Sequence, residues 1–112
     1  MCEYQYIKDQ LDEIYDYYGE ENQQLKLIEE MGELISAMAR DDYDNYIEEL
    51  ADVSIVLEQI IINLNKNRKK QFEEIRIAKI EKTLKNIKNE KDEQIRTCSI
   101  VEQVMGGSFL NE

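Results

Sequence analysis

The sequence predicts an all-α fold, a helical bundle of about four main helices. The chain of 112 residues contains no proline and only four glycines, so few residues can interrupt a helix. Apolar residues recur at steps of three and four along much of the chain, which is the period of an α-helix. The length fits a single domain over residues 1–112 with a thin core, and we expect homo-oligomerisation to complete the bundle.

Two helices are expected in the first part of the chain. The first runs from about residue 3 to residue 18 and ends at Gly19, because glycine is the usual residue just after a helix. The second runs from about residue 21 to residue 40. Its apolar stripe consists of Ile28, Met31, Ile35 and Met38. We expect this stripe to face the core.

A third helix is expected from about residue 45 to residue 65, after a turn at Asp41 and Asp42. Asp42 or Asp44 can cap it. Between Val53 and Ile62 the helix is apolar on almost every side, and such a helix is usually buried on most sides. We therefore expect a subunit interface there. The stretch is much shorter than the ~20 apolar residues that span a bilayer, so no membrane partner is expected.

The pattern is less regular after the third helix. A polar, basic stretch over residues 65–70 precedes a fourth helix, which is expected from about residue 71 to residue 89. Residues 90–112 form a weakly patterned tail. A short helix near Ile100 is expected to end at Gly106. The well-patterned core of the domain thus covers about residues 19–88.

Charge is distributed unevenly along the chain. Residues 1–60 contain 17 acids and 3 bases, a balance of −14, whereas residues 61–112 contain 8 acids and 11 bases, a balance of +3. Proteins that bind nucleic acids need a basic surface to replace the counterions of the phosphates. The acidic half therefore argues against a nucleic-acid partner.

Several classes of chemistry are excluded by what the sequence lacks. Without histidine there is no Ser-His or Cys-His nucleophile and no His-ligated zinc. Cys2 and Cys98 form no CxxC pair and are expected to be free thiols. No signal-peptide pattern precedes the first helix, so we expect a cytoplasmic protein.

Carboxylates stand out on the second and third expected helices. Glu30 and Glu33 are three residues apart on one, and Glu49 and Asp52 are three residues apart on the other. Each pair lies on one face, beside the apolar stripe and therefore at the edge of the core. The turn between the helices is short, so they should pack antiparallel and bring the two pairs together.

Four carboxylates in one groove repel one another unless a cation neutralises them. Oxygen ligands select magnesium, manganese or calcium, and magnesium usually binds together with substrate phosphates. Each pair alone is common on ordinary solvated helices. Two pairs joined by a short turn are much less common, and they predict a Mg²⁺ site in which Mn²⁺ can substitute.

The arrangement resembles the MazG-like nucleoside triphosphate pyrophosphohydrolases, which belong to the all-α NTP pyrophosphatase superfamily. The signature of that family is EExxE, a variable spacer and ExxD. In this chain the two parts are Glu29-Glu30-Met-Gly-Glu33 and Glu49-Leu-Ala-Asp52, separated by 15 residues. The resemblance extends over roughly residues 19–88. Each half of the motif is weak, whereas the combination is fairly specific.

The resemblance implies roles for individual residues. The magnesium ligands would be Glu30, Glu33, Glu49 and Asp52. Glu29 would hold a further ion or position water, and Glu29 or Glu33 would accept the proton of the attacking water. The residues implied in substrate binding are Gln23, Lys26, Lys79 and Lys82. Lys82 stands where the family often has arginine. Its ammonium group would contact a phosphate as a point charge, in place of the bidentate contact that a guanidinium makes.

The implied reaction is NTP plus water giving NMP and pyrophosphate, performed by a dimer or by a tetramer built from dimers. Four tyrosines can stack on a base, although packing is the commoner role of such residues. They are Tyr15, Tyr17, Tyr18 and Tyr46. A phosphoribosyl-ATP pyrophosphohydrolase is disfavoured, because the histidine that usually follows ExxD is missing. A dimeric dUTPase stays open.

Two other hypotheses remain. The chain can be a non-catalytic acidic helical interaction or regulatory module, which leaves the paired acids as a coincidence. It can also be a degenerate member of the family that binds nucleotide without cleaving it, although its four signature acids are intact. Magnesium-dependent turnover separates the enzyme from both.

Overall fold

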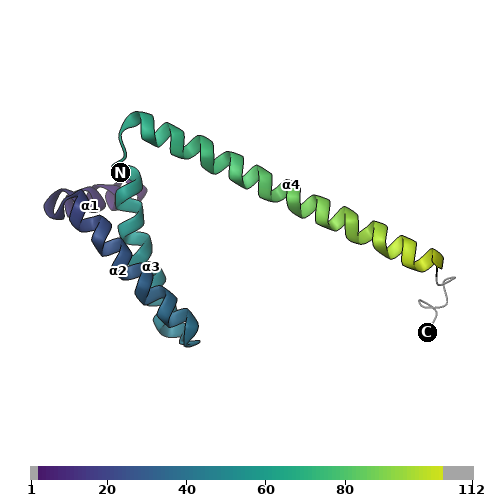
Figure 1. The fold of residues 1–112 in the computed structure, drawn as a ribbon. Coiled ribbons are helices and arrows are strands. Elements are labelled where there is room, and N and C mark those ends of the chain that lie inside the picture. Colours follow the sequence, from purple (N-terminus) through teal and green to yellow (C-terminus); the bar gives the residue numbers. More distant parts are fainter. Residues whose placement is uncertain (1–2, 105–112) are drawn as a thin grey trace. The chain divides into compact units, whose positions relative to one another are not determined.

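A computed structural model of the chain describes residues 3–104, and these residues form four helices and no strand (Figure 1). This confirms the predicted all-α fold. The helices are α1 (Glu3–Tyr18), α2 (Glu20–Ala39), α3 (Tyr43–Ile62) and α4 (Lys66–Val104). Cys2 and Gly106 lie outside the described residues.

The chain divides into two compact units, residues 1–69 and residues 70–112. The first unit holds α1, α2 and α3, with α2 packed along α3 and α1 in contact with both. The second unit holds most of α4. The organisation of the whole chain as a single domain stays a prediction.

The turns between the first three helices follow from their sequence. Gly19 separates α1 from α2 with a φ of 88°, a left-handed conformation that glycine adopts without strain. Its N–H donates to the carbonyl of Tyr15 at 2.8 Å, which closes α1. At the start of α3, the side chain of Asp42 accepts a hydrogen bond from the N–H of Asn45 at 3.3 Å. The end at Gly19 was expected from the sequence, and of the two predicted caps, Asp42 and Asp44, the structure has Asp42.

The prediction for the last part of the chain was wrong in its boundaries. Residues 66–104 form one continuous helix of 39 residues, not a helix over 71–89 followed by a separate short one. The side chain of Asn65 accepts a hydrogen bond from the N–H of Arg68 at 2.9 Å, so the helix begins in the stretch that was expected to be irregular. No glycine or proline occurs between residues 66 and 104, so no residue there favours a break.

The hairpin of α2 and α3 has an unexpected interior. The apolar stripe of α2 was predicted to face the core, but Ile28 is 68% exposed and Ile35 is 64% exposed. The residues of α2 that pack inward include Gln23 and Glu30, and those of α3 include Glu49 and Gln59. Carboxylates and amides therefore pack between the two helices, and Glu30 and Glu49 lie in this interface and not at the edge of the core, whereas Glu33 is exposed.

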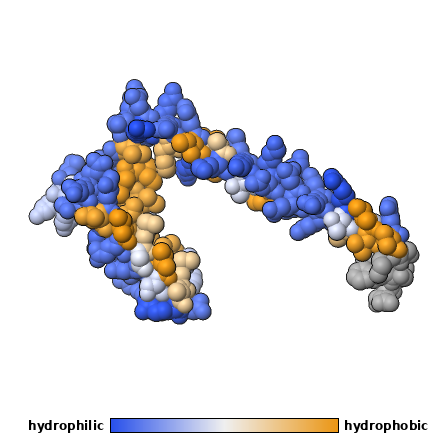
Figure 2. Space-filling view, viewed as in Figure 1, coloured by the Kyte–Doolittle hydropathy of each residue, from blue (hydrophilic) through white to orange (hydrophobic). Residues whose placement is uncertain are grey.

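The outward faces are correspondingly apolar. Figure 2 shows hydrophobic residues gathered on the surface of the hairpin, whereas the surface of α4 is mainly hydrophilic with small hydrophobic patches. None of the residues of α4 is buried, although Ile77, Ile80 and Leu84 are apolar. Within the described residues, no helix has the length and hydropathy needed to cross a membrane.

Candidate metal centre

Two helical stripes bring acidic side chains into the interior of the hairpin. On α2 the inward residues are spaced by four, three, four and three: Gln23, Leu27, Glu30, Leu34 and Ala37. On α3 the spacing is three, four and three: Glu49, Asp52, Val56 and Gln59. Because these steps follow the period of the α-helix, each stripe stays on the face that meets the other helix.

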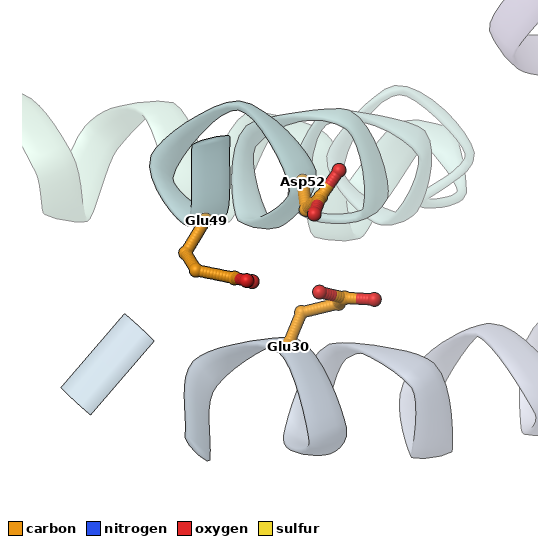
Figure 3. Close-up of side chains that lie close together, drawn as sticks. All are labelled: Glu30, Glu49 and Asp52. Atoms are coloured by element: carbon orange, nitrogen blue, oxygen red, sulfur yellow. The ribbon is translucent and has the colours of Figure 1, made fainter. Parts of the chain in front are cut away.

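Three carboxylates meet between the helices. Glu30 extends from α2, and Glu49 and Asp52 extend from α3 toward it (Figure 3). One carboxylate oxygen from each residue lies within 4.8 Å of the others. These are three of the four acids that the sequence predicted to act together as metal ligands.

Two carboxylate oxygens of this cluster form no hydrogen bond with the described residues. The Oε2 atoms of Glu30 and Glu49 are buried and have no hydrogen-bond partner in the described part of the chain. The residues themselves are only 6% and 8% exposed. Burying a carboxylate oxygen without a hydrogen bond is costly, and a second carboxylate nearby adds repulsion. A bound cation would remove both penalties, so the orphaned oxygens are a physical sign of a cation site.

The fourth predicted ligand, Glu33, lies at the side of this cluster. It is exposed on α2, one turn beyond Glu30, and it interacts with Glu49. The pKa of Glu49 is raised from 4.5 to about 7, first by burial, then by a hydrogen bond with Glu33 and by the negative charges of the neighbouring Glu33, Asp52 and Glu30. A proton on Glu49 therefore relieves part of the repulsion when no cation is present.

Lys26 supplies a positive charge beside the cluster. Its Nζ lies 3.0 Å from Oε1 of Glu30 and 3.8 Å from Oε1 of Glu29. The hydrogen bond with Glu30, followed by the charge of Glu29, raises the pKa of Lys26 above its usual value. Glu29, which the sequence suggested for a further ion or for proton transfer, is exposed and belongs to this ion pair instead of the buried cluster.

Gln23, a predicted substrate-binding residue, is buried next to a partner that the sequence analysis missed. Its Nε2 donates a hydrogen bond to Oε1 of Gln59 at 2.8 Å, and the two residues are 5% and 1% exposed. The sequence did contain a signal. Gln59 is a polar residue inside the apolar stretch 53–62, and a buried glutamine of this kind needs a polar partner.

The predicted lysines of α4 belong to the second unit. Lys79 and Lys82 are both exposed, and the carbonyl of Lys79 accepts a hydrogen bond from Thr83 at 2.9 Å. Their role as phosphate contacts stays a prediction.

Among the four tyrosines proposed for base stacking, Tyr17 and Tyr18 make an edge-on ring contact with centroids 4.9 Å apart. Tyr46 instead packs near Tyr43, with centroids 6.2 Å apart. Tyr15 is half-buried. Tyr18 also lines a groove next to the carboxylates, together with Lys26, Glu30 and Asp52.

Comparison with known proteins identifies a family. The sequence model of the family described as MazG nucleotide pyrophosphohydrolase domain matches residues 19–89, which include all of α2 and α3 and the whole carboxylate cluster. No curated protein and no solved structure matches the chain significantly.

Proposed function

The chain belongs to the MazG nucleotide pyrophosphohydrolase family, and from this premise we propose that it is a Mg²⁺-dependent nucleoside triphosphate pyrophosphohydrolase. Its reaction converts NTP or dNTP and water into NMP or dNMP and pyrophosphate, with nucleotide-pool housecleaning as its role. The observation that carries the proposal is the cluster of Glu30, Glu49 and Asp52, in which two buried carboxylate oxygens have no partner among the described residues.

The donor set of the cluster fits a hard divalent cation. It offers only carboxylate oxygens, and Mg²⁺ and Mn²⁺ prefer oxygen ligands to nitrogen or sulfur ligands. Glu30, Glu49 and Asp52 would hold the ion, with Glu33 beside them. When bound, Mg²⁺ supplies positive charge that polarises phosphate oxygens and lowers the pKa of water.

Glu33 is the better of the two predicted proton acceptors. It interacts with Glu49 at the cluster and is exposed, so it can take a proton from a water molecule and return it to solvent. Glu29 is paired with Lys26, which makes it the weaker candidate for this task. The ammonium group of Lys26 lines the groove beside Glu30 and would attract phosphate oxygens.

The proposed reaction balances without any further reactant. The water oxygen forms a bond to the α-phosphorus, one of its protons passes to Glu33, and the other stays on the new oxygen of the NMP phosphate. The bond between the α-phosphorus and the oxygen that bridges to the β-phosphorus breaks, and its electron pair leaves with pyrophosphate. Lys79 and Lys82 are the proposed contacts that offset the charge of this leaving group.

We also propose that the active form is a homodimer or a homotetramer. The support is the outward face of α2, where Ile28, Met31, Ile35 and Met38 are all about half exposed or more. A continuous apolar face of this kind is typical of a protein–protein interface. The apolar stretch 53–62 of α3 favours the same conclusion.

The test is product analysis with a panel of ribo- and deoxyribonucleoside triphosphates in the presence of Mg²⁺. Pyrophosphate and orthophosphate are measured separately, because NMP with pyrophosphate identifies cleavage at the α-phosphorus. We expect NMP and pyrophosphate from the wild type and almost none from Glu33→Gln. The matched control is Glu48→Gln, since Glu48 is an exposed acid next to Glu49 that lies outside the cluster.

The rival hypotheses predict different results. A non-catalytic interaction module would give no product across the panel and no change of thermal stability with Mg²⁺. A degenerate family member would bind nucleotide without turnover. Release of NDP and orthophosphate would also contradict the proposal, because it places the cleavage at another phosphorus.

A further inference from the structure

A groove with a volume of about 410 Å³ lies beside the carboxylates within the first unit. Glu30 and Asp52 line it, and so do Gln23 and Gln59. Gln23 lies seven residues before Glu30 on α2, and Gln59 lies seven residues after Asp52 on α3. Seven residues of α-helix correspond to about 10 Å. The groove therefore joins a cluster of acids to a pair of amides, a separation that a ribose and a base can bridge.

The amide pair is buried and fixed in place. The hydrogen bond from Gln23 to Gln59 is 2.8 Å long, and Gln59 is only 1% exposed. Each carboxamide has two N–H donors and an oxygen with two lone pairs, so this one bond leaves further hydrogen-bonding capacity in both side chains. A carboxamide presents a donor and an acceptor side by side, an arrangement that matches the polar edge of a nucleobase.

The remaining walls of the groove suit the faces of a base. Ile14 and Tyr18 of α1 and Ile55 of α3 line it with apolar surface. Asn22, another residue of the groove, donates a hydrogen bond from Nδ2 to the carbonyl of Tyr18 at 2.7 Å, which ties the end of α1 to α2. Small-molecule sites commonly combine such apolar walls with a few fixed polar groups, in volumes of roughly 300–1,000 Å³.

We propose that Gln59, held by Gln23, is a specificity-determining residue that recognises the base of the nucleoside triphosphate in this groove. The inference rests on the proposed function, and it adds the place where one nucleotide is distinguished from another. It assigns to Gln59 a role that none of the carboxylates or lysines can fill, since these groups address the phosphates and the cation.

The first test needs no variant. The wild-type protein is assayed with its best nucleoside triphosphate and with ribose 5-triphosphate, which lacks the base. If the amide pair binds the base, removal of the base raises KM by ~10-fold or more, while kcat changes less. Calorimetry without Mg²⁺ adds a readout independent of turnover, because the NMP product should bind at least ~10-fold more tightly than ribose 5-phosphate.

The second test removes the amide itself. Gln59→Leu keeps a similar side-chain volume, and we expect the ratio of kcat/KM between the best and the poorest base to fall by ~10-fold or more, mainly through KM. The thermal shift caused by Mg²⁺ should stay as in the wild type. Gln24→Leu is the matched control, since Gln24 is an exposed neighbour on α2 outside the groove, and it should keep the full base preference.

The outcomes separate this inference from the proposed function. Turnover of all triphosphates with equal kcat/KM, the base-free one included, would overturn the base site and leave the pyrophosphohydrolase intact. Equal losses for every base in Gln59→Leu would also overturn it, because a structural defect affects all substrates alike. If Gln59→Leu does not fold, the wild-type measurements decide, namely the assay with ribose 5-triphosphate and the calorimetry with ribose 5-phosphate. Failure of the proposed function appears separately, as absence of wild-type turnover.

Discussion

The inner face of α2 buries polar residues and its outer face exposes apolar ones, which is the reverse of an ordinary surface helix. On the inner face Glu30 is 6% exposed and Gln23 is 5% exposed, whereas on the outer face Ile28 is 68% exposed and Ile35 is 64% exposed. Burial of acids and exposure of isoleucines oppose the usual gain from the hydrophobic effect. We infer that the inner face is arranged for a cation and a substrate, and that the outer face is arranged for another subunit.

The largest expected effect comes from breaking the inner face. Asp52→Asn removes the charge of one carboxylate of the cluster and keeps its shape, so we expect kcat/KM to fall by at least ~100-fold, because the site then binds the cation and stabilises developing charge less well. Steady-state pyrophosphate release measures the effect. Asp44→Asn is the control, and activity equal to the wild type in Asp52→Asn would contradict the role of the cluster.

The outer face is tested by placing a charge on it. Ile35→Glu should weaken self-association, because burial of an isoleucine side chain contributes roughly 1.5–3 kcal/mol and a symmetric interface loses this contribution once from each copy. Light scattering after gel filtration measures the mass at several concentrations. A control variant, Gln24→Glu, changes an exposed residue of α2 outside that apolar stripe and should leave the mass unchanged. An unchanged mass in both variants would place the interface elsewhere.

The buried Glu49 of the site should also make the stability of the protein depend on pH when no divalent cation is present. The pKa of Glu49 is raised from 4.5 to about 7, so between these values the folded protein binds more protons than the unfolded one. The free energy of unfolding should therefore fall as the pH rises from about 4.5 through about 7. Thermal unfolding in a chelator measures it, and Mg²⁺ should reduce the decline. Glu49→Gln should lack this component of the pH dependence, and an identical profile in that variant would exclude Glu49 as its source.

The smallest expected effect concerns the turn that sets α3 against α2. Asp42→Ala removes the side-chain oxygen that accepts a hydrogen bond from the N–H of Asn45, and we expect a loss of about 1 kcal/mol in the free energy of unfolding. Urea unfolding followed by circular dichroism measures it. Asp42→Asn preserves an accepting oxygen and should retain most of the stability. Equal losses in the two variants would mean that charge, not capping, is responsible.

The sequence predicted the helices of the first unit well because local signals define them. Gly19 and Asp42 mark their ends through backbone conformation and capping, which depend on few neighbours. The extent of α4 was missed because a polar, basic stretch was interpreted as a break, although Asn65 caps a helix there and neither glycine nor proline interrupts it. Polarity alone does not end a helix.

The candidate site was predicted in part. The spacing of the acids and their short connection predicted that Glu30 and Asp52 would meet, and the structure brings them together with Glu49. Their burial was not predicted, because the apolar stripe of α2 gave the stronger signal for the core and faces outward in the single chain. The bond between Gln23 and Gln59 spans 36 residues, a long-range contact that no periodicity of a single helix reveals.

The central claim is that the inner face binds a divalent cation, and direct titration with Mn²⁺ tests it most simply. The signal of free Mn²⁺ in electron paramagnetic resonance disappears when the ion binds to protein. We predict that the wild type removes this signal, that added Mg²⁺ restores it by competition, and that Glu30→Gln binds Mn²⁺ at least ~10-fold more weakly while Glu48→Gln binds it normally. Equal binding in all three proteins, or no binding by the wild type, would contradict the account.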